Sequence, residues 1–355
     1  MRTLPATFIG WKRDMILKDV FLFSLNAVMP ILLLLILGSL LRRMGFYGDD
    51  FLKTANRLVF RLGLPVLLFY NVYSLDSLQD VNWPTVWYAL LVVTVLFALG
   101  ALCARLCTSD DRRRGVLWQC TFRSNLAVIG LPLAQSLGGL AGVASVSVLN
   151  AFTIPFFNVL AVLALSAYAP DQSGDTLQRL RGIGKKVLTN PLILGVALGF
   201  VCLGVRAVLP QGADGSIVFS IERDLPFLYT AIRYLSQLAT PLALLALGGQ
   251  FRFDAVGNMK KEIILGTAMR VMVAPMIGVG AAALLASAGV LSLAAGDYAA
   301  LVALFGSPVA VSSAVMAAEM GSDEQLAGQY VVWTSICSML TIFLMVALLR
   351  SVSLL

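Results

Sequence analysis

Histidine is missing from this 355-residue chain, and cysteine is rare. Without histidine, the chain lacks the side chain that most often binds metals and carries protons near neutral pH. None of the cysteines forms a Cys-x-x-Cys pair, so the sequence indicates neither a zinc site nor a disulfide framework. We therefore predict no metal site and no bound cofactor. The five cysteines are Cys103, Cys107, Cys120, Cys202 and Cys337.

Charged residues are also scarce, at 13% of the chain against 59% hydrophobic residues, whereas soluble domains carry about 25% charged residues. Apolar stretches of about 20 residues, long enough to cross a bilayer as a helix, recur from Leu25 almost to the C-terminus. These proportions predict an all-α polytopic protein of the lipid bilayer. The net charge of +7 would indicate a nucleic-acid partner in a soluble chain. Here we attribute it to loops that set the membrane orientation, and we predict no nucleic-acid partner.

The apolar stretches predict ten transmembrane helices. In order they are 25–41, 52–73, 84–106, 115–137, 142–168, 187–208, 229–250, 262–288, 297–320 and 325–349.

Basic residues gather in the loops after the first, third, fifth and seventh spans, and the loops after the second, fourth and eighth carry none. Cytoplasmic loops are enriched in lysine and arginine, so we predict that the odd-numbered loops face the cytoplasm, and that the protein is a multi-pass protein of the inner (plasma) membrane. Two features do not follow this rule, because the N-terminal tail is basic and the loop after the ninth span is acidic. The basic loop residues are Arg42, Arg43, Arg112, Arg113, Arg114, Arg179, Arg181, Lys185, Lys186, Arg252, Lys260 and Lys261.

Proline spacing indicates an internal repeat. The polar connection 169–186 divides the ten predicted spans into two sets of five. Pro65 and Pro132 are 67 residues apart, and so are Pro241 and Pro308. Because each set has an odd number of spans, the second must cross the membrane in the direction opposite to the first. We therefore predict an inverted repeat, the arrangement of many secondary transporters.

The repeat divides the chain into units 24–168 and 187–350, joined by the short cytoplasmic loop. Residues 1–23 form an N-terminal tail, which we interpret either as an interfacial helix or as a stretch upstream of a true start at Met15.

Glycine and proline interrupt the fourth and ninth spans in the same way, at Gly130 and Pro132 and at Gly306 and Pro308. Proline has no N–H and clashes with the preceding turn, so we expect each helix to break near its proline. Freed backbone groups are tolerated at membrane depth only beside a cavity, protein or ligand, and freed helix N-termini favour an anion. Prolines in membrane helices can also be simple kinks. Because these two interruptions are matched, we predict a binding site where the two broken helices cross.

At these residues the sequence resembles the auxin efflux carrier family, which includes the plant PIN-FORMED proteins and bacterial malonate-transporter-like proteins. The first crossover motif of that family reads Asn, four residues, Gly, one residue, Pro, and here it is Asn125, Gly130 and Pro132. Further similarity lies in "MPILLLLILGSLLRRMGF" at 29–46, "NPLILGVALGF" at 190–200, "ATPLALLALGGQF" at 239–251 and the region 306–349.

The resemblance implies a ten-span fold of two inverted five-helix repeats, with the substrate at the crossing of the broken fourth and ninth helices. Helices 1, 2, 6 and 7 would form a scaffold, and helices 3–5 and 8–10 a transport domain that moves as an elevator. The large cytoplasmic loop of the plant members is reduced here to 169–186, which favours a bacterial type of member.

Amides, hydroxyls and opened backbone near the two breaks are the candidate ligands. An asparagine amide offers both a donor and an acceptor to a carboxylate, although Asn125 could instead cap its helix. The resemblance places Asn150 near the substrate. Serine hydroxyls could reach substrate or a coupling cation, or pack helices together. The candidate substrate-binding residues are Asn125, Gly130, Leu131, Pro132, Asn150, Gly306, Ser307, Pro308, Val309, Ser312 and Ser313.

Of the arginines within predicted spans, Arg123 and Arg270 lie well inside theirs, where a charge costs about 2.5–3.5 kcal/mol. Arg123 and Arg270 could each attract an anion, and for Arg270 we favour a side chain that extends to the cytoplasmic edge. We interpret Asn158 as a helix–helix hydrogen bond.

These features favour a secondary transporter of small organic anions, with carboxylates such as malonate, malate or auxin-like acids as substrates. A sodium-coupled symporter of the bile-acid-symporter type is the main alternative, and a non-transporting membrane sensor is another. The absence of a nucleophile beside a base argues against an enzyme. The sequence leaves open whether transport is coupled to Na⁺ or H⁺ and whether the protein forms a homodimer.

Overall fold

The computed structural model describes residues 6–74, 82–168, 176–208, 220–252 and 254–355. In this part of the chain the regular structure is helical, apart from one isolated β-bridge. The first half contains α1 (Ala6–Arg43), α2 (Asp49–Leu58), η1 (Val59–Gly63), α3 (Leu64–Tyr73), α4 (Trp83–Cys107), α5 (Asp111–Phe122), η2 (Leu126–Gly130) and α6 (Leu131–Ser166). The second half contains α7 (Thr176–Leu188), α8 (Pro191–Val208), α9 (Ile221–Asp224), α10 (Pro226–Gln250), η3 (Asp254–Asn258), α11 (Lys260–Ala268), η4 (Met269–Val273), η5 (Met276–Gly280), α12 (Ala281–Ser287), α13 (Ala295–Gly306), α14 (Ser312–Glu319) and α15 (Glu324–Ser351).

Within the described residues, five continuous helical stretches are long and apolar enough to cross a bilayer. They confirm a polytopic all-α membrane protein, whereas the count of ten spans stays a prediction. The five are Trp83–Cys107, Leu126–Ser166, Pro226–Gln250, Lys260–Ser287 and Glu324–Ser351.

Helix boundaries differ from the prediction at three places. Helix α1 runs from Ala6 through residue 24 without a break, and residues 1–5 of the predicted tail lie outside the described chain. Of the predicted loop 169–186, residues 169–175 also lie outside it, and the rest belongs to α7. Helix α8 begins only at Pro191, since proline suits the first helical position and the Asn190 side chain accepts a hydrogen bond from the Leu192 backbone N–H.

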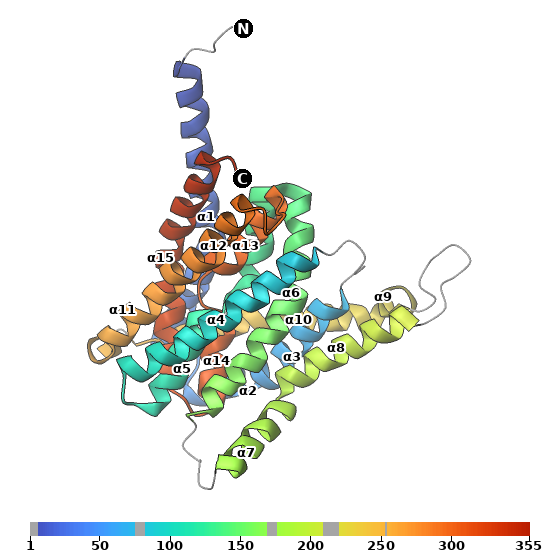
Figure 1. Ribbon diagram of the computed structural model, residues 1–355. Helices are drawn as coiled ribbons and strands as arrows, with labels where there is room; N and C mark the ends of the chain where they lie inside the picture. Colours follow the sequence, from blue (N-terminus) through green and yellow to red (C-terminus); the bar gives the residue numbers. More distant parts are fainter. Residues whose placement is uncertain (1–5, 75–81, 169–175, 209–219, 253) are drawn as a thin grey trace.

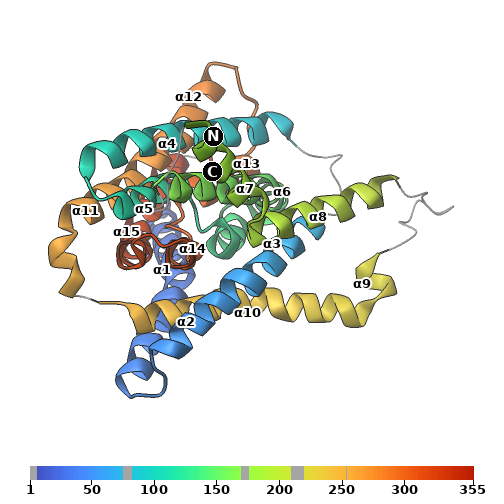
Figure 2. The same cartoon turned by 90° about the horizontal axis from the view of Figure 1, so that it is seen from below.

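The helices pack in two groups that face each other (Figures 1 and 2). In one group α10 packs against α2, α3 and α1, and α3 packs against α8. In the other, α6 packs against α4, α5 and α13, and α15 packs against α11 and α14. Helix α1 contacts both α10 and α15. It approaches α10 closely because Gly248 faces the Leu35 carbonyl, where a Cβ would collide.

A glycine also turns the chain sharply inside α6. Gly139 has φ 57° and ψ −141°, a conformation that side chains with a Cβ rarely adopt. It separates 131–138 from 140–166, in the predicted connection between the fourth and fifth spans.

Loops with basic residues meet at one end of the molecule, which we call the basic end. Arg113 forms ion pairs of 3.2 Å with both Glu262 and Asp323, and Arg112 donates to the Gly321 carbonyl. The acidic loop after the predicted ninth span therefore lies beside the basic loops as their counter-charge. This contact explains why it departs from the positive-inside pattern.

At the opposite end a buried carboxylate joins three segments of the chain. Asp297 accepts hydrogen bonds from the Asn82 amide and from the Ser145 hydroxyl, each at 3.0 Å. These three residues follow, or lie close to, the second, fourth and eighth predicted connections, so described residues beside three of the connections that the sequence places away from the cytoplasm meet at this end.

Candidate functional site at the crossing of two broken helices

The two interrupted helices meet backbone to backbone. Helix α5 ends at Phe122 and η2 begins at Leu126, while α13 ends at Gly306 and α14 begins at Ser312. Between these ends Ser124 and Val309 form an antiparallel β-bridge, and the Asn125 N–H donates to the Pro308 carbonyl at 2.8 Å. The backbone groups of each break, which have no hydrogen-bond partner within their own helix, thus find partners in the other break.

The first break does not lie at Pro132, where the sequence predicted it. Residues 123–125 leave the helix, and the chain is helical again from η2 through α6. The wide π-helical turn of η2 precedes Pro132, which therefore occupies an early position of α6 rather than ending a helix. Leu131 and Pro132 are both exposed, so their side chains point away from the crossing. In the ninth span the prediction holds, because Pro308 lies within the break.

Arg270 joins the C-terminal ends of both half-helices. Its guanidinium donates to the carbonyls of Ser307 and Leu304 at 2.9 Å each, and to that of Phe122 at 3.3 Å. A further bond goes to the Phe305 carbonyl. Helix C-termini carry negative partial charge, so they compensate the cation. Arg270 is fully buried, and the prediction that it extends to the cytoplasmic edge is wrong.

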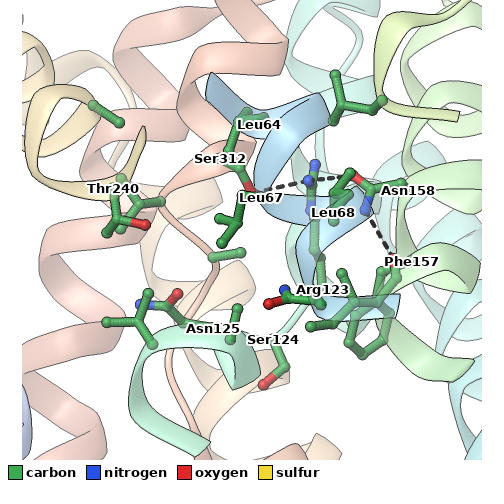
Figure 3. A pocket seen from close by; sticks show the side chains of 18 residues that line it. Leu64, Leu67, Leu68, Arg123, Ser124, Asn125, Phe157, Asn158, Thr240 and Ser312 are labelled. Carbon is green, nitrogen blue, oxygen red and sulfur yellow. Dashed lines mark hydrogen bonds between the residues drawn. The ribbon is translucent and has the colours of Figure 1, made fainter. Parts of the chain in front are cut away.

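A small cavity of about 50 Å³ lies at the crossing, on the side of the half-helix N-termini. Both groups of helices line it, as the close view shows (Figure 3). A water needs about 10–15 Å³ of such space, so the cavity holds about four waters or one carboxylate group. Its lining residues are Leu64, Leu67, Leu68, Asn71, Arg123, Ser124, Asn125, Ala127, Val128, Ile154, Phe157, Asn158, Leu192, Thr240, Ala243, Ala310, Val311 and Ser312.

Arg123 brings an uncompensated positive charge to this cavity. Its guanidinium donates to Asn158 Oδ1 at 2.8 Å and to Ser312 Oγ at 2.9 Å (Figure 3), and it also contacts Gln119 Oε1 and Met316 Sδ. All four partners are neutral, and neither Arg123 nor Arg270 forms an ion pair within the described chain. Because Arg123 is 97% buried, an anion in the cavity would supply the missing counter-charge.

Polar atoms without partners also border the cavity. Asn125 Nδ2 and Ser124 Oγ are buried and form no hydrogen bond within the described structure. Buried polar groups normally have partners, so these two indicate a bound molecule or water. The half-helices η2–α6 and α14 begin here, and their first N–H groups add positive partial charge. The site therefore combines donors with a cation and suits an anion.

The other predicted residues take different positions. Gly306, Ser307, Pro308 and Val309 build the second break but do not line the cavity; the Val309 N–H donates to Thr334 Oγ1 at 3.0 Å. Gly130 is buried against Leu126, and Ser313 is buried away from the cavity.

Of the two asparagines of α6, Asn158 lines the cavity and Asn150 does not. The interpretation of Asn158 as a helix–helix hydrogen bond is accurate but incomplete, because its partner is Arg123. Sequence reasoning also missed Asn71 and Thr240, which line the cavity from α3 and α10. Both are polar residues inside apolar helices close to proline, and that signal could have identified them.

A wider polar cavity of about 700 Å³ lies between the small cavity and the basic end, and we call it the vestibule. Helix α14 begins at the small cavity with Ser312 and ends at the vestibule with Glu319, about 10 Å further along. Here Gln250 accepts hydrogen bonds of 3.1 Å from Asn56 and Gln325. The vestibule is lined by Arg42, Asp49, Leu52, Lys53, Asn56, Arg57, Gly249, Gln250, Arg252, Ala318, Glu319, Glu324 and Gln325.

Comparison with known proteins identifies the family of the chain. A family described as membrane transport protein matches residues 23–346, which is most of the chain. The chain belongs to this family. A protein of Methanothermobacter thermautotrophicus, described as an uncharacterized transporter, is 24% identical over 335 residues, covering 91% of this chain and 97% of that relative. Both findings identify a multi-pass membrane transport protein rather than an enzyme, and they agree with the resemblance to auxin efflux carriers at the level of the family.

Proposed function

We propose that this family member is a secondary transporter of small organic anions, and that carboxylates are its substrates. The observation that carries the proposal is the buried guanidinium of Arg123, whose four partners are neutral and which borders the cavity at the crossing. A carboxylate there would gain a charge-assisted hydrogen bond. The free Asn125 Nδ2 and Ser124 Oγ would hold its second oxygen.

Transport requires that access to the cavity alternate between the two sides of the membrane. Leu64, Asn71 and Thr240 line the cavity from one group of helices, and Arg123 and Ser312 line it from the other. Movement of one group along the other would therefore carry the anion together with Arg123 and break its contacts with the wall formed by Leu64, Asn71 and Thr240.

This movement fits an elevator mechanism in which predicted helices 1, 2, 6 and 7 are the scaffold and 3–5 and 8–10 the transport domain. Ten spans in two inverted repeats, a plasma-membrane location and a homodimer belong to the same proposal. In this arrangement the vestibule would be the cytoplasmic entrance.

Counterflow in proteoliposomes tests the proposal. Purified protein should exchange a labelled carboxylate from a panel of malonate, malate, butyrate and an auxin-like aryl acetate. Parallel assays with and without a sodium gradient distinguish a uniporter or proton-coupled carrier from the sodium-coupled alternative. A protein that binds a carboxylate but exchanges none would instead be a sensor, and absence of both binding and exchange would refute the proposal.

Asn150 provides a control for Asn125, because each has a buried side-chain atom without a hydrogen-bond partner in the described structure but only Asn125 lines the cavity. Asn125→Ala should reduce exchange by at least about tenfold, because a donor to the carboxylate is lost, while insertion and folding stay intact. Asn150→Ala should exchange at the wild-type rate, since Asn150 lies outside the cavity. The opposite pattern would place the substrate elsewhere along α6.

A further inference from the structure

A second cavity, of about 360 Å³, is a groove on the membrane side of the molecule between α1 and α15. On α15 it lies at the level of the crossing, since Thr334, which accepts the hydrogen bond from the Val309 N–H, directly follows Trp333, but it shares no lining residue with the small cavity. Its walls are formed by Leu32, Leu35, Ile36, Ser39, Leu40, Arg43, Phe251, Val332, Trp333 and Ile336.

The length of the groove matches one leaflet of a bilayer. From Arg43 to Leu32 the wall follows eleven residues of α1, about 16 Å at 1.5 Å per residue. Half of a hydrocarbon core is about 15 Å thick. The wall is apolar along this length except at Ser39, and the Trp333 indole N–H is already bonded to Gln329 Oε1. The groove therefore suits one extended acyl chain.

The end of the groove carries a positive charge without a partner. Arg43 is exposed and forms no ion pair within the described chain, whereas the neighbouring Arg42 pairs with Asp49 at 2.6 Å. No acidic residue lines the groove. Arg43 lies at the basic end, which we predict faces the cytoplasm, and anionic lipids are abundant in cytoplasmic leaflets.

We propose that this groove binds an anionic phospholipid, with one acyl chain between α1 and α15 and the phosphate at Arg43. Charge complementarity selects the headgroup, and the match in length selects an acyl chain over a peptide or a second copy of the chain. Because α1 packs against α10 of one group and α15 of the other, the lipid lies between the two groups of helices, whose relative movement rests on the proposed function. The site does not depend on which anion the protein transports.

Quenching of Trp333 fluorescence by brominated lipids tests the site. The full chain is reconstituted into phosphatidylcholine vesicles with increasing amounts of phosphatidylglycerol brominated on its acyl chains, or of phosphatidylcholine brominated likewise. The signal of Trp333 is the part of the quenching that Trp333→Phe removes. We expect phosphatidylglycerol to bind at the groove about fivefold more tightly than phosphatidylcholine, the selectivity of about one basic residue near a membrane surface.

Three variants distinguish the contribution of the headgroup charge to lipid binding from that of the apolar groove. Arg43→Gln should abolish the fivefold preference, whereas Arg42→Gln, with the same loss of charge one residue away, should retain it. Ile336→Phe, which adds bulk without a second fluorophore, should partly fill the groove and weaken binding of both lipids. Equal quenching by both lipids in the wild type, or equal effects of the two arginine variants, would overturn the proposal. The proposal would also fail if the protein dimerised through this face, with Ile336→Phe dissociating the dimer and leaving the quenching by lipid unchanged.

Discussion

Replacing Arg123 by glutamine should separate substrate binding from folding. The guanidinium donates to Asn158 and Ser312, and its charge is uncompensated because none of its partners is acidic. Glutamine retains a donor for these two side chains but removes the charge. The substitution therefore alters what an anion meets in the cavity while preserving much of the local hydrogen bonding.

The expected magnitudes differ for the two properties. A hydrogen bond to a charged group contributes about 1.5–3 kcal/mol, so anion affinity should fall about 10- to 150-fold. For folding, removal of the buried charge recovers its desolvation cost of about 2.5–3.5 kcal/mol. This gain offsets the loss of hydrogen-bond energy, because bonds to neutral partners contribute only about 0.5–1.5 kcal/mol each. The melting temperature of the ligand-free protein should therefore change by only a few degrees.

Arg270→Gln is the matched control, since it removes the other buried arginine of the crossing. Its partners are backbone carbonyls at the helix ends, which cannot rotate toward new donors. Leaving them unsatisfied costs about 1–3 kcal/mol each, so this variant should lose stability clearly. Thermal unfolding in detergent and competition against a labelled carboxylate in proteoliposomes measure both properties for both variants.

An Arg123→Gln protein that competes within threefold of the wild type would refute the assignment of Arg123 as the anion-binding group. An Arg123→Gln protein that unfolds as readily as Arg270→Gln would show that Arg123 is structural instead. Arg123→Lys adds a further check, because it keeps the charge and should recover part of the affinity without the planar, two-pronged geometry.

Three further predictions follow from the positions of side chains. Pro132→Ala should exchange substrate within about twofold of the wild type, because Pro132 is exposed and the helix breaks upstream; a tenfold loss in counterflow would contradict this. Arg113→Ala should destabilise the protein by about 1–3 kcal/mol, since Glu262 and Asp323 would lose their shared cation, and an unchanged melting temperature would argue against it. Butyrate should compete at least about tenfold better than succinate, because Arg123 is the one charged residue that lines the cavity in the described chain and a second carboxylate would be buried without a partner; equal competition would refute this reasoning.

Much of the fold could be predicted from local properties of the sequence. Low charge and long apolar runs indicated a polytopic helical membrane protein, because the bilayer excludes backbone without internal hydrogen bonds. Asn125, Arg123 and Ser312 were predicted as candidate ligands because polar residues are rare at membrane depth, and all three line the cavity. The break at Pro308 was predictable from the missing N–H of proline.

The position of the first break was not predictable in this way. It lies at 123–125 because Ser124 pairs with Val309 and Asn125 donates to Pro308, partners from the other half of the chain. Pro132, the local signal, is accommodated in a helix after a π-helical turn.

The sequence by itself thus determined the class of protein and the polar residues from which a site could be built. The tertiary structure decided their roles. It turned Arg270 toward the carbonyl ends of two half-helices and left Arg123 among neutral partners at the cavity. It also brought Asn71 and Thr240 to the opposite wall. The physical reason is that the role of a buried charge depends on which groups surround it, and those groups come from helices far apart in the chain.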